Sequence, residues 1–313
     1  MNRRRFLEQG LGLSAPLFFW GANRPSDAWG ADDAAPDKMN RIGCTTVCFR
    51  PRFPSTRADA APQPDDWTPL VVPRVFAEQL GVHNVELWSR HFPDTSPAYC
   101  RRVRAAAEAV GSRIINIQLD EPGYNLSHAD AAERTKSVEM VRQWMDRAAA
   151  CGATSLRANT GGGRAEPFDV NLTGDCFAQL TEHGRKIGVK ILVENHGGHS
   201  SDPDNIVAIL KHVDSPFCRA LPDFGNIPAG FTPQQRKAFL EKLFPYAHLV
   251  SAKGMVFDEQ YRHLTYDVGA SVEQGEAAGF EGIYSVELWA PNYYPPDPNR
   301  AVKQMIQTIA ASL

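Results

Sequence analysis

The feature that most constrains the fold is a regular alternation of short apolar runs and longer amphipathic segments, from residue 41 to the C-terminus. Each short run is bounded by polar or glycine-containing turns and predicts a buried parallel strand. The segments between them predict helices, most of which stop at a glycine, as at Gly81, Gly111, Gly152, Gly188 and Gly279. The eight expected strands lie at residues 41–49, 85–88, 112–119, 154–158, 190–194, 218–222, 249–253 and 283–289.

Eight strand–helix units in series predict an α/β protein with one domain, a (β/α)8 or TIM barrel, over residues 41–313. A doubly wound open sheet is the rival architecture. Its commonest dinucleotide-binding version is excluded because no Gly-x-Gly-x-x-Gly motif follows the first strand. The glycines at 161–163 lack the Lys-Ser/Thr of a phosphate-binding loop, so we expect a turn there. The Pro-rich residues 51–67 are too long for a simple βα loop and predict a lid or contact loop.

Residues 1–31 have a different character. Adjacent arginines, Arg3 and Arg4, precede Phe-Leu and a mild apolar stretch at 11–20, a pattern that resembles a twin-arginine export signal. A membrane span is the alternative, but the run is shorter than the roughly 20 residues needed and is broken by Pro16. We therefore predict export to the periplasm or an equivalent compartment, with residues 32–40 as a polar linker to the barrel.

Charge and cysteine usage exclude several classes of protein. The formal net charge is -3 and no dense Lys/Arg run occurs beyond the N-terminus, which argues against nucleic acid as a partner. The cysteines are scattered, and twin-arginine substrates fold in a reducing compartment where disulfides are rare. We predict free, buried thiols rather than a disulfide framework or zinc site at Cys44, Cys48, Cys100, Cys151, Cys176 and Cys218.

The ends of the expected strands share one property: the last inward-facing residue of each is polar. Side chains alternate along a strand, so the inward positions can be counted back from each strand end. Active sites of such barrels are built at this C-terminal mouth. The inward residues predicted in this way are Thr46, Glu86, Gln118, Asn159, Glu194, Asp223, Lys253 and Glu287.

The segment 190–198, Lys-Ile-Leu-Val-Glu-Asn-His-Gly-Gly, is the most informative of these strand ends. A buried carboxylate such as Glu194 is costly unless it is paired or coordinated, and a structural ion pair is the plainer interpretation. Several carboxylates at one mouth also require positive charge, because like charges raise one another's pKa. A divalent metal with oxygen ligands from several strands would supply it.

Three strand-end motifs resemble the xylose-isomerase-like barrel family: Glu194 in Val-Glu-Asn-His-Gly-Gly, Asp223 in Pro-Asp-Phe-Gly-Asn, and Glu287 in Tyr-Ser-Val-Glu-Leu. That family includes sugar-phosphate isomerases and epimerases, ketose 3-epimerases and inosose dehydratases, with endonuclease IV more distantly related. The resemblance covers nearly all of the chain after the signal. Its motifs are moderately specific for the superfamily and poorly specific for substrate.

The resemblance implies a divalent metal (Mn, Mg, Co or Zn) held by Glu194, Asp223 and Glu287, because the epimerase branch uses Glu, Asp, His and Glu from strands five to eight. The chain departs from this pattern at the seventh strand, where Ser251 replaces the histidine and Lys253 keeps the family's lysine. Three alternatives remain open at this point. His196 supplies a nitrogen ligand, water fills the gap, or the metal is lost and Lys253 supplies the charge. By its position in the sequence, His248 faces away from the mouth, and His199 is expected to be a solvated loop residue.

The expected chemistry is proton transfer next to a carbonyl of a carbohydrate-like substrate, with Glu194, Glu287 and Lys253 as catalytic residues. Aromatic residues near the strand ends suit sugar rings, although both tryptophans could instead pack beneath the helices. Arg157 either binds substrate oxygens or pairs with Glu194. The substrate-binding residues predicted on these grounds are Glu86, Trp88, Gln118, Arg157, Asn159, His196, Asn226 and Trp289.

Other functions remain to be distinguished. A lyase or dehydratase acting on a keto-sugar begins with the same enolisation, and the missing histidine also suits a catalytically silent sugar-binding homologue. A DNA-repair hydrolase on this barrel would need more histidines at the strand ends and a basic face, which the chain lacks. The expected partner is a small carbohydrate, with no nucleic acid and no stable membrane span. The sequence leaves the oligomeric state open, a homo-oligomer included.

Overall fold

The computed structural model describes residues 36–57, 61, 63–163 and 167–313. The predicted export signal lies outside these residues. No helix of the described chain is both long and apolar enough to cross a membrane.

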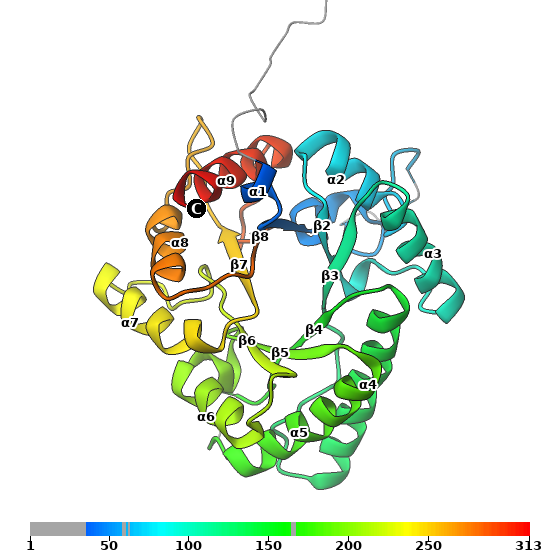
Figure 1. The fold of residues 1–313 in the computed structure, drawn as a ribbon, viewed down its shortest axis with the longest axis vertical. Coiled ribbons are helices and arrows are strands. Elements are labelled where there is room, and N and C mark those ends of the chain that lie inside the picture. The colour runs from blue at the N-terminus through cyan, green and yellow to red at the C-terminus, as the bar shows by residue number, and fades with distance from the viewer. Residues whose placement is uncertain (1–35, 58–60, 62, 164–166) are drawn as a thin grey trace, which may run out of the picture. The chain divides into compact units, whose positions relative to one another are not determined.

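Eight parallel strands form the inner ring of the molecule, and helices form the outer ring (Figure 1). Neighbouring strands pair in the order β6-β5-β4-β3-β2-β1-β8-β7, and parallel bridges Ala220–Ala247 and Asp223–Ser251 join β6 to β7. The predicted (β/α)8 barrel is therefore confirmed. Its strands are β1 (Ile42–Thr45), β2 (Asn84–Trp88), β3 (Arg113–Gln118), β4 (Ser155–Ala158), β5 (Lys190–Glu194), β6 (Cys218–Leu221), β7 (Leu249–Gly254) and β8 (Ile283–Leu288).

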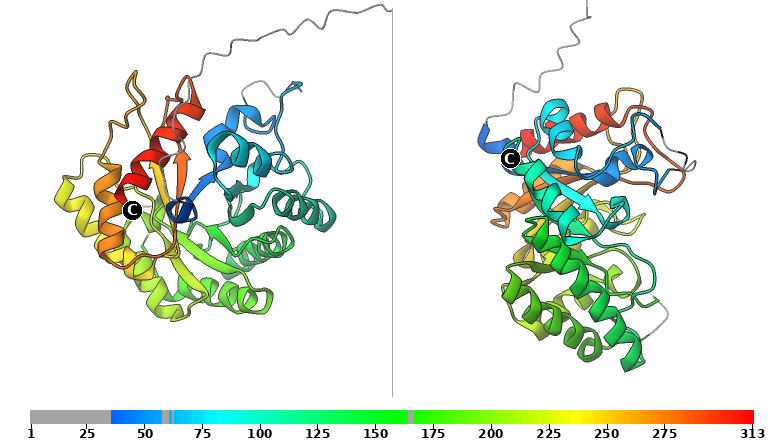
Figure 2. Two further views of the ribbon diagram at one scale, coloured as in Figure 1. Left: turned by 45° about the horizontal axis from the view of Figure 1, so that its top comes forward. Right: turned by 90° about the vertical axis from the view of Figure 1, so that its right-hand side faces the viewer.

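The helices lie outside the strands and alternate with them along the chain (Figure 2). Side-chain caps begin most of them, and a glycine in the left-handed region ends several, because only glycine adopts that conformation without a steric cost. Gly188 and Gly279 both have φ 77°, which confirms the helix ends predicted there. The helices are α1 (Pro36–Met39), α2 (Val72–Leu80), α3 (Pro97–Glu108), α4 (Ala131–Ala150), α5 (Val170–Ile187), α6 (Pro203–Val213), α7 (Pro233–Leu243), α8 (Val268–Ala277) and α9 (Pro298–Ser312).

Two hydrophobic cores support the barrel. The larger lies between the strands and the surrounding helices. The smaller fills the inside of the barrel with Ile115, Leu192, Leu221, Leu249 and Ile283. Leu192 and Leu221 come two residues before Glu194 and Asp223, so strand alternation places this apolar plug directly below the polar mouth. The described cysteines are all free and buried, as predicted.

The first strand is shorter than predicted, and this moves one inward residue. Strand β1 ends at Thr45, and a 3-10 helix, η1 (Thr46–Arg52), follows at once. The Thr45 hydroxyl accepts a hydrogen bond from the Val47 backbone N–H and donates to Gln118 Oε1 at 2.7 Å. Thr45, rather than Thr46, therefore faces the interior, because the helical turn begins where the alternation was expected to continue.

Part of the predicted linker is structured. Residues 36–39 form α1, which lies beside α9 (Figures 1 and 2). Lys38 Nζ donates to the Ala310 carbonyl oxygen at 2.8 Å, and this bond ties the start of the described chain to the last helix. Within the expected lid segment, Trp67 packs against Phe49 with ring centroids 5.1 Å apart.

Candidate active site

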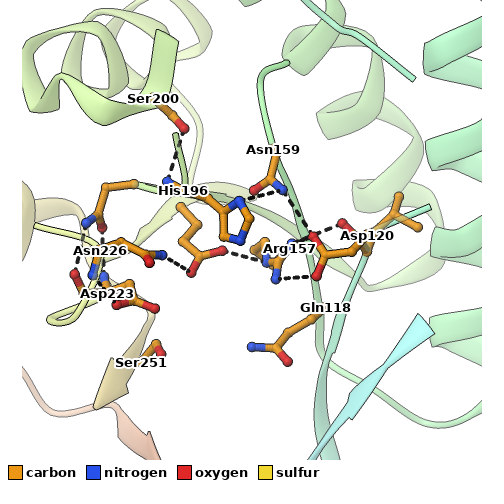
Figure 3. A network of polar contacts seen from close by, with 12 residues as sticks. Gln118, Asp120, Arg157, Asn159, His196, Ser200, Asp223, Asn226 and Ser251 are labelled. Carbon is orange, nitrogen blue, oxygen red and sulfur yellow. Dashed lines mark hydrogen bonds and ion pairs between the residues drawn. The ribbon is translucent and has the colours of Figure 1, made fainter. Parts of the chain in front are cut away.

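The C-terminal mouth of the barrel brings most of the predicted polar residues into one hydrogen-bonded network, part of which is shown in Figure 3. Two buried cations organise it: Lys253 from β7 and Arg157 from β4. Between them they contact the three carboxylates that the resemblance assigns to a metal.

Lys253 is at the centre of the first group. Its Nζ lies 3.0 Å from Asp223 Oδ2, 2.9 Å from Glu287 Oε1 and 2.9 Å from Asn226 Oδ1, and only 3% of its side chain is exposed. Burial alone would lower the pKa of Lys253, but Asp223 and Glu287, with Glu194 nearby, raise it well above its usual range. Lys253 is therefore a permanent cation at neutral pH.

Arg157 is at the centre of the second group. Its Nε lies 2.8 Å from Glu194 Oε2, and its NH1 and NH2 groups donate to the two oxygens of Asp120 at 2.5 and 3.1 Å. NH1 also donates to the Leu119 carbonyl oxygen at 3.0 Å. Arg157 thus forms an ion pair with Glu194, which was one of its two predicted roles, and its hydrogen bonds go to Asp120 and the Leu119 carbonyl oxygen (Figure 3).

Two asparagines hold the carboxylates in place. Asn195 exchanges two hydrogen bonds with the backbone of Asp223, at 2.7 and 2.9 Å. Asn226 joins the two groups, because its Nδ2 donates to Glu194 Oε1 at 3.2 Å while its Oδ1 accepts from Lys253. A continuous path of contacts therefore runs from Glu194 through Asn226 and Lys253 to Glu287.

Burial shifts the pKa of Glu194, which lies on this path, and of Asp223, which contacts Lys253 beside it. It raises the pKa of Glu194, although Arg157 and Lys253 oppose the change. It also raises the pKa of Asp223; Lys253 opposes this shift, and the neighbouring Glu194 carboxyl adds to it. A proton is consequently retained among these carboxyl groups to higher pH than in water, as a residue that donates protons requires.

Glu86 lies one layer below the mouth. Its two oxygens accept from Asn116 Nδ2 at 2.7 Å and from Ser285 Oγ at 2.6 Å, and the residue is 1% exposed. Burial raises its pKa to about 7. Gln118, in the layer above, accepts from Thr45 and donates to Glu287 Oε2 at 2.8 Å. These two predicted binding residues therefore support the site from beneath.

A polar cavity of about 300 Å³ opens above the Arg157 group. His196 lines it and, although exposed as a residue, has its pKa lowered to about 4 by burial of the ring and by Arg157. The ring is therefore neutral, and its Nδ1 faces Asn159 Nδ2 at 3.2 Å. The other lining residues include Asp120, Glu121, Tyr124 and Asn159.

A larger cavity, of about 650 Å³, lies on the other side of the turn formed by Gly197 and Gly198. Phe168, Phe231 and Phe239 line it, and no residue of the Arg157 or Lys253 groups does. The smaller cavity is lined by Asp120, which pairs with Arg157, and by the predicted binding residues Asn159 and His196, so we place the substrate there. His199 lines the larger cavity and is 4% exposed, so the prediction that it is solvated was wrong. Gly162 packs against its ring, whereas Gly161 packs against Asn125.

The two tryptophans have different environments. Trp88 is 6% exposed, and its Nε1 donates to Asp120 Oδ2 at 2.7 Å, so it fixes the residue that orients Arg157. Trp289 is 40% exposed, and the Arg50 guanidinium lies over its ring at 4.6 Å. The two rings meet edge to face at 6.3 Å. Trp289 is thus available as an aromatic wall, whereas Trp88 has a positioning role.

The carboxylates do not fit a divalent metal in this arrangement. Lys253 already lies between Asp223 and Glu287, and Glu194 faces Arg157. No group of three or more His, Cys, Asp or Glu side chains within the described chain is placed to hold a metal ion.

The candidates for a fourth ligand are also engaged elsewhere. The Ser251 hydroxyl lies 3.5 Å from Glu287 Oε2, and His196 faces Asn159 rather than the carboxylates. His248 lies at the opposite end of the barrel beside Lys190, where burial lowers its pKa to about 4. Of the open alternatives, the geometry agrees best with Lys253 as the source of positive charge.

Sequence reasoning missed two residues of the site. Asp120 follows β3 with the same parity as Gln118, so extending the count by two positions would have found it. Asn195 acts through the backbone of Asp223, and its sequence carries no signal for that contact.

Comparison with known proteins agrees with this fold. The profile described as "Xylose isomerase-like TIM barrel" matches residues 75–311. A search of curated proteins found no significant match. Among solved structures, a D-tagatose 3-epimerase-like protein superposes with a TM-score of 0.64 at 15% identity, covering 87% of this chain and 97% of that chain.

Two further structures have the same fold. The 3-keto-D-glucoside 4-epimerase of E. coli gives a TM-score of 0.62 at 14% identity, covering 87% and 99% of the two chains. A xylose isomerase-like TIM barrel protein from Mycobacterium smegmatis, in complex with magnesium, gives 0.61 at 17% identity, covering 87% and 97%. The family match over most of the chain confirms the resemblance seen in the strand-end motifs: this protein belongs to the xylose isomerase-like TIM barrel family.

Proposed function

We propose that this protein is a sugar isomerase or epimerase that moves a proton at a carbon next to a carbonyl group. Family membership and the sugar epimerases among its structural neighbours support this class of reaction. The observation that carries the proposal is the path Glu194–Asn226–Lys253–Glu287, which places two carboxyl groups on either side of a buried ammonium group.

The reaction follows from what these groups can exchange. Glu287 removes the proton from carbon, and the electron pair of the C–H bond moves onto the carbonyl oxygen as an enediolate. Lys253 stabilises the new negative charge by hydrogen bonding. Glu194, whose raised pKa suits a donor, then returns a proton to the same carbon or its neighbour. Return to the same carbon gives an epimer. Return to the neighbouring carbon, with the hydroxyl proton of the first carbon passing to the enediolate oxygen, gives an isomer.

The polar cavity suits an uncharged carbohydrate. Asp120 and Glu121 line it, and none of its described lining residues is a lysine or arginine. A lining with carboxylates and no lysine or arginine offers no cation to a phosphate group, so it disfavours phosphorylated sugars, which carry two negative charges near neutral pH. Asn159 and His196 offer hydrogen bonds to hydroxyl groups.

Proton exchange measured in D2O tests this function. The full chain is incubated with ketoses and keto-glycosides, and deuterium at the carbon next to the carbonyl is followed by proton NMR. We expect incorporation with wild type, and a loss of about 10²–10⁴-fold with Glu194→Gln or Glu287→Gln. Glu78→Gln on the exposed face of α2 is the matched control.

The same spectra separate the alternatives. Deuterium incorporation followed by loss of a β-substituent would identify a lyase. Sugars that bind without any exchange would identify a silent binding homologue and contradict the proposal. If both Glu→Gln variants changed only stability, with activity per folded molecule unchanged, the carboxylates would be structural.

We also propose that the enzyme works outside the cytoplasm, because residues 1–31 resemble a twin-arginine signal. Arg3→Lys together with Arg4→Lys should leave folded protein in the cytoplasm. Normal delivery of this double variant to the envelope would contradict the assignment.

A further inference from the structure

Lys253 occupies the centre of the group of oxygens that the family pattern assigns to a metal. Its nitrogen donates a hydrogen bond to Asn226 Oδ1 at 2.9 Å and forms ion pairs with Asp223 and Glu287 at 3.0 and 2.9 Å. An ammonium group carries three N–H donors, and three oxygens surround this one. The arrangement is that of a coordinated cation, with the cation supplied by the chain.

Gly225 provides the space for this lysine. A Cβ atom at position 225 would lie 2.8 Å from Lys253 Cδ and Cγ and 2.9 Å from its Cβ, closer than side-chain atoms approach one another. The Gly225 backbone N–H also donates to Asp223 Oδ1 at 2.7 Å. The turn that positions the carboxylate therefore also forms the channel for the lysine side chain.

The backbone of Lys253 is held as firmly as its side chain. Tyr266 donates its hydroxyl hydrogen to the Lys253 carbonyl oxygen, and β7 pairs with β8 so that Lys253 stands next to Glu287 in register. A metal placed between Asp223 and Glu287 would have to expel a side chain that is anchored at both ends.

The rest of the environment also disfavours a divalent ion. Ser251 offers a hydroxyl where the family pattern has a nitrogen ligand, and this hydroxyl is turned toward Glu287. Arg157 adds a second positive charge beside Glu194. An incoming dication would therefore meet two fixed cations and would lack its nitrogen donor.

We propose that Lys253 is the resident cation of this site and that the enzyme needs no divalent metal. This inference rests on the proposed function for its chemistry. As Glu287 takes up the carbon proton it becomes neutral, and the substrate oxygen gains the negative charge. One Lys253 N–H then turns from Glu287 Oε1 to that oxygen. Lysine keeps its proton throughout, and the total charge around it stays the same.

Metal binding, measured without any substrate, tests the inference. The full-length protein is treated with a chelator, dialysed, and titrated with Mn²⁺, Mg²⁺, Co²⁺ and Zn²⁺ while bound metal and melting temperature are recorded. We expect no stoichiometric binding and no rise in melting temperature. Binding of about one equivalent per chain with a raised melting temperature would overturn the proposal.

A designed variant provides the positive control. Lys253→Met combined with Ser251→His removes the resident cation and restores the nitrogen ligand, so it should bind about one equivalent of Mn²⁺. The matched control is Lys211→Met, which removes one exposed positive charge from α6 and should resemble wild type.

The wild-type titration decides the question even if the double variant fails to fold. A protein that binds no metal and turns over no sugar would contradict the proposed function and leave this inference intact. A protein that binds metal and turns over sugars would contradict this inference and support the proposed function.

Discussion

Arg157 and Lys253 are both buried cations at the barrel mouth, but they are held in different ways. Arg157 presents its planar guanidinium to Asp120 through two parallel bonds and to Glu194 through a third contact. Lys253 makes three single contacts from one nitrogen. Arginine is a rigid fork, whereas lysine is a compact charge whose donors can rotate.

The difference suggests that the Arg157 group and the Lys253 group have different roles in the same site. The Arg157 group fixes geometry, because two parallel bonds to Asp120 and one to the Leu119 carbonyl oxygen orient the guanidinium, and its proton is never released. The Lys253 group can exchange one oxygen partner for another as charge moves from Glu287 to substrate. We therefore expect changes at Arg157 to affect mainly stability, and changes at Lys253 to affect mainly turnover.

The largest effect should come from Arg157→Met. It leaves Glu194 and Asp120 buried without their cation, and removing one partner of a buried ion pair costs about 3–5 kcal/mol of unfolding free energy. Chemical denaturation at pH 7 measures it. If Arg157→Met were as stable as wild type, Arg157 would not be the residue that fixes the geometry of the site.

Lys253→Met should lower kcat by about 10²–10³-fold, because the developing oxyanion loses its buried donor. Turnover is compared per folded molecule, with Lys211→Met as the control for removal of a positive charge. If the kcat of Lys253→Met matched wild type and only stability fell, the two cations would play the same role.

Glu86→Gln tests whether the layer beneath the mouth has its own pH dependence. With its pKa raised to about 7 from 4.5, Glu86 favours the folded state most below pH 4.5, and this contribution is lost as pH rises through 7. Relative to Glu86→Gln, wild type should therefore lose up to about 3 kcal/mol of unfolding free energy across that window. If the difference in unfolding free energy between wild type and Glu86→Gln stayed the same at every pH, the pKa of Glu86 would not be raised in the folded state.

Gly225→Ala should have the smallest effect on stability and sharpen the role of Lys253. The new methyl group crowds the lysine side chain, and overpacking of this kind costs about 1–3 kcal/mol. We expect kcat to fall while KM changes little, because the displaced ammonium group acts on the transition state. If Gly225→Ala lowered stability but left kcat unchanged, the position of the Lys253 ammonium group would not control turnover.

Much of this site could be predicted because the barrel imposes simple rules. Alternation along parallel strands predicts from the sequence alone that Glu194, Asp223, Lys253 and Glu287 meet at one mouth. The same rule failed at β1, where Thr45 caps a helical turn and Thr46 leaves the sheet. A change from strand to 3-10 helix leaves little trace in hydrophobic periodicity.

The pairing of charges could not be predicted. Arg157 and Lys253 both lie at strand ends, and nothing in their spacing indicates which carboxylate each would contact. That choice depends on the reach of each side chain and on Gly225, whose missing Cβ makes room for Lys253. It also depends on Asp120, which accepts hydrogen bonds from both terminal nitrogens of Arg157.

The measurement that most directly tests the account is deuterium exchange into substrate by chelator-treated wild-type protein. If Lys253 is the cation that stabilises the enediolate, exchange should continue at an unchanged rate after all divalent metal has been removed, and added Mn²⁺ or Mg²⁺ should not increase it. Exchange that stops on chelation and returns in full when metal is added would contradict the account.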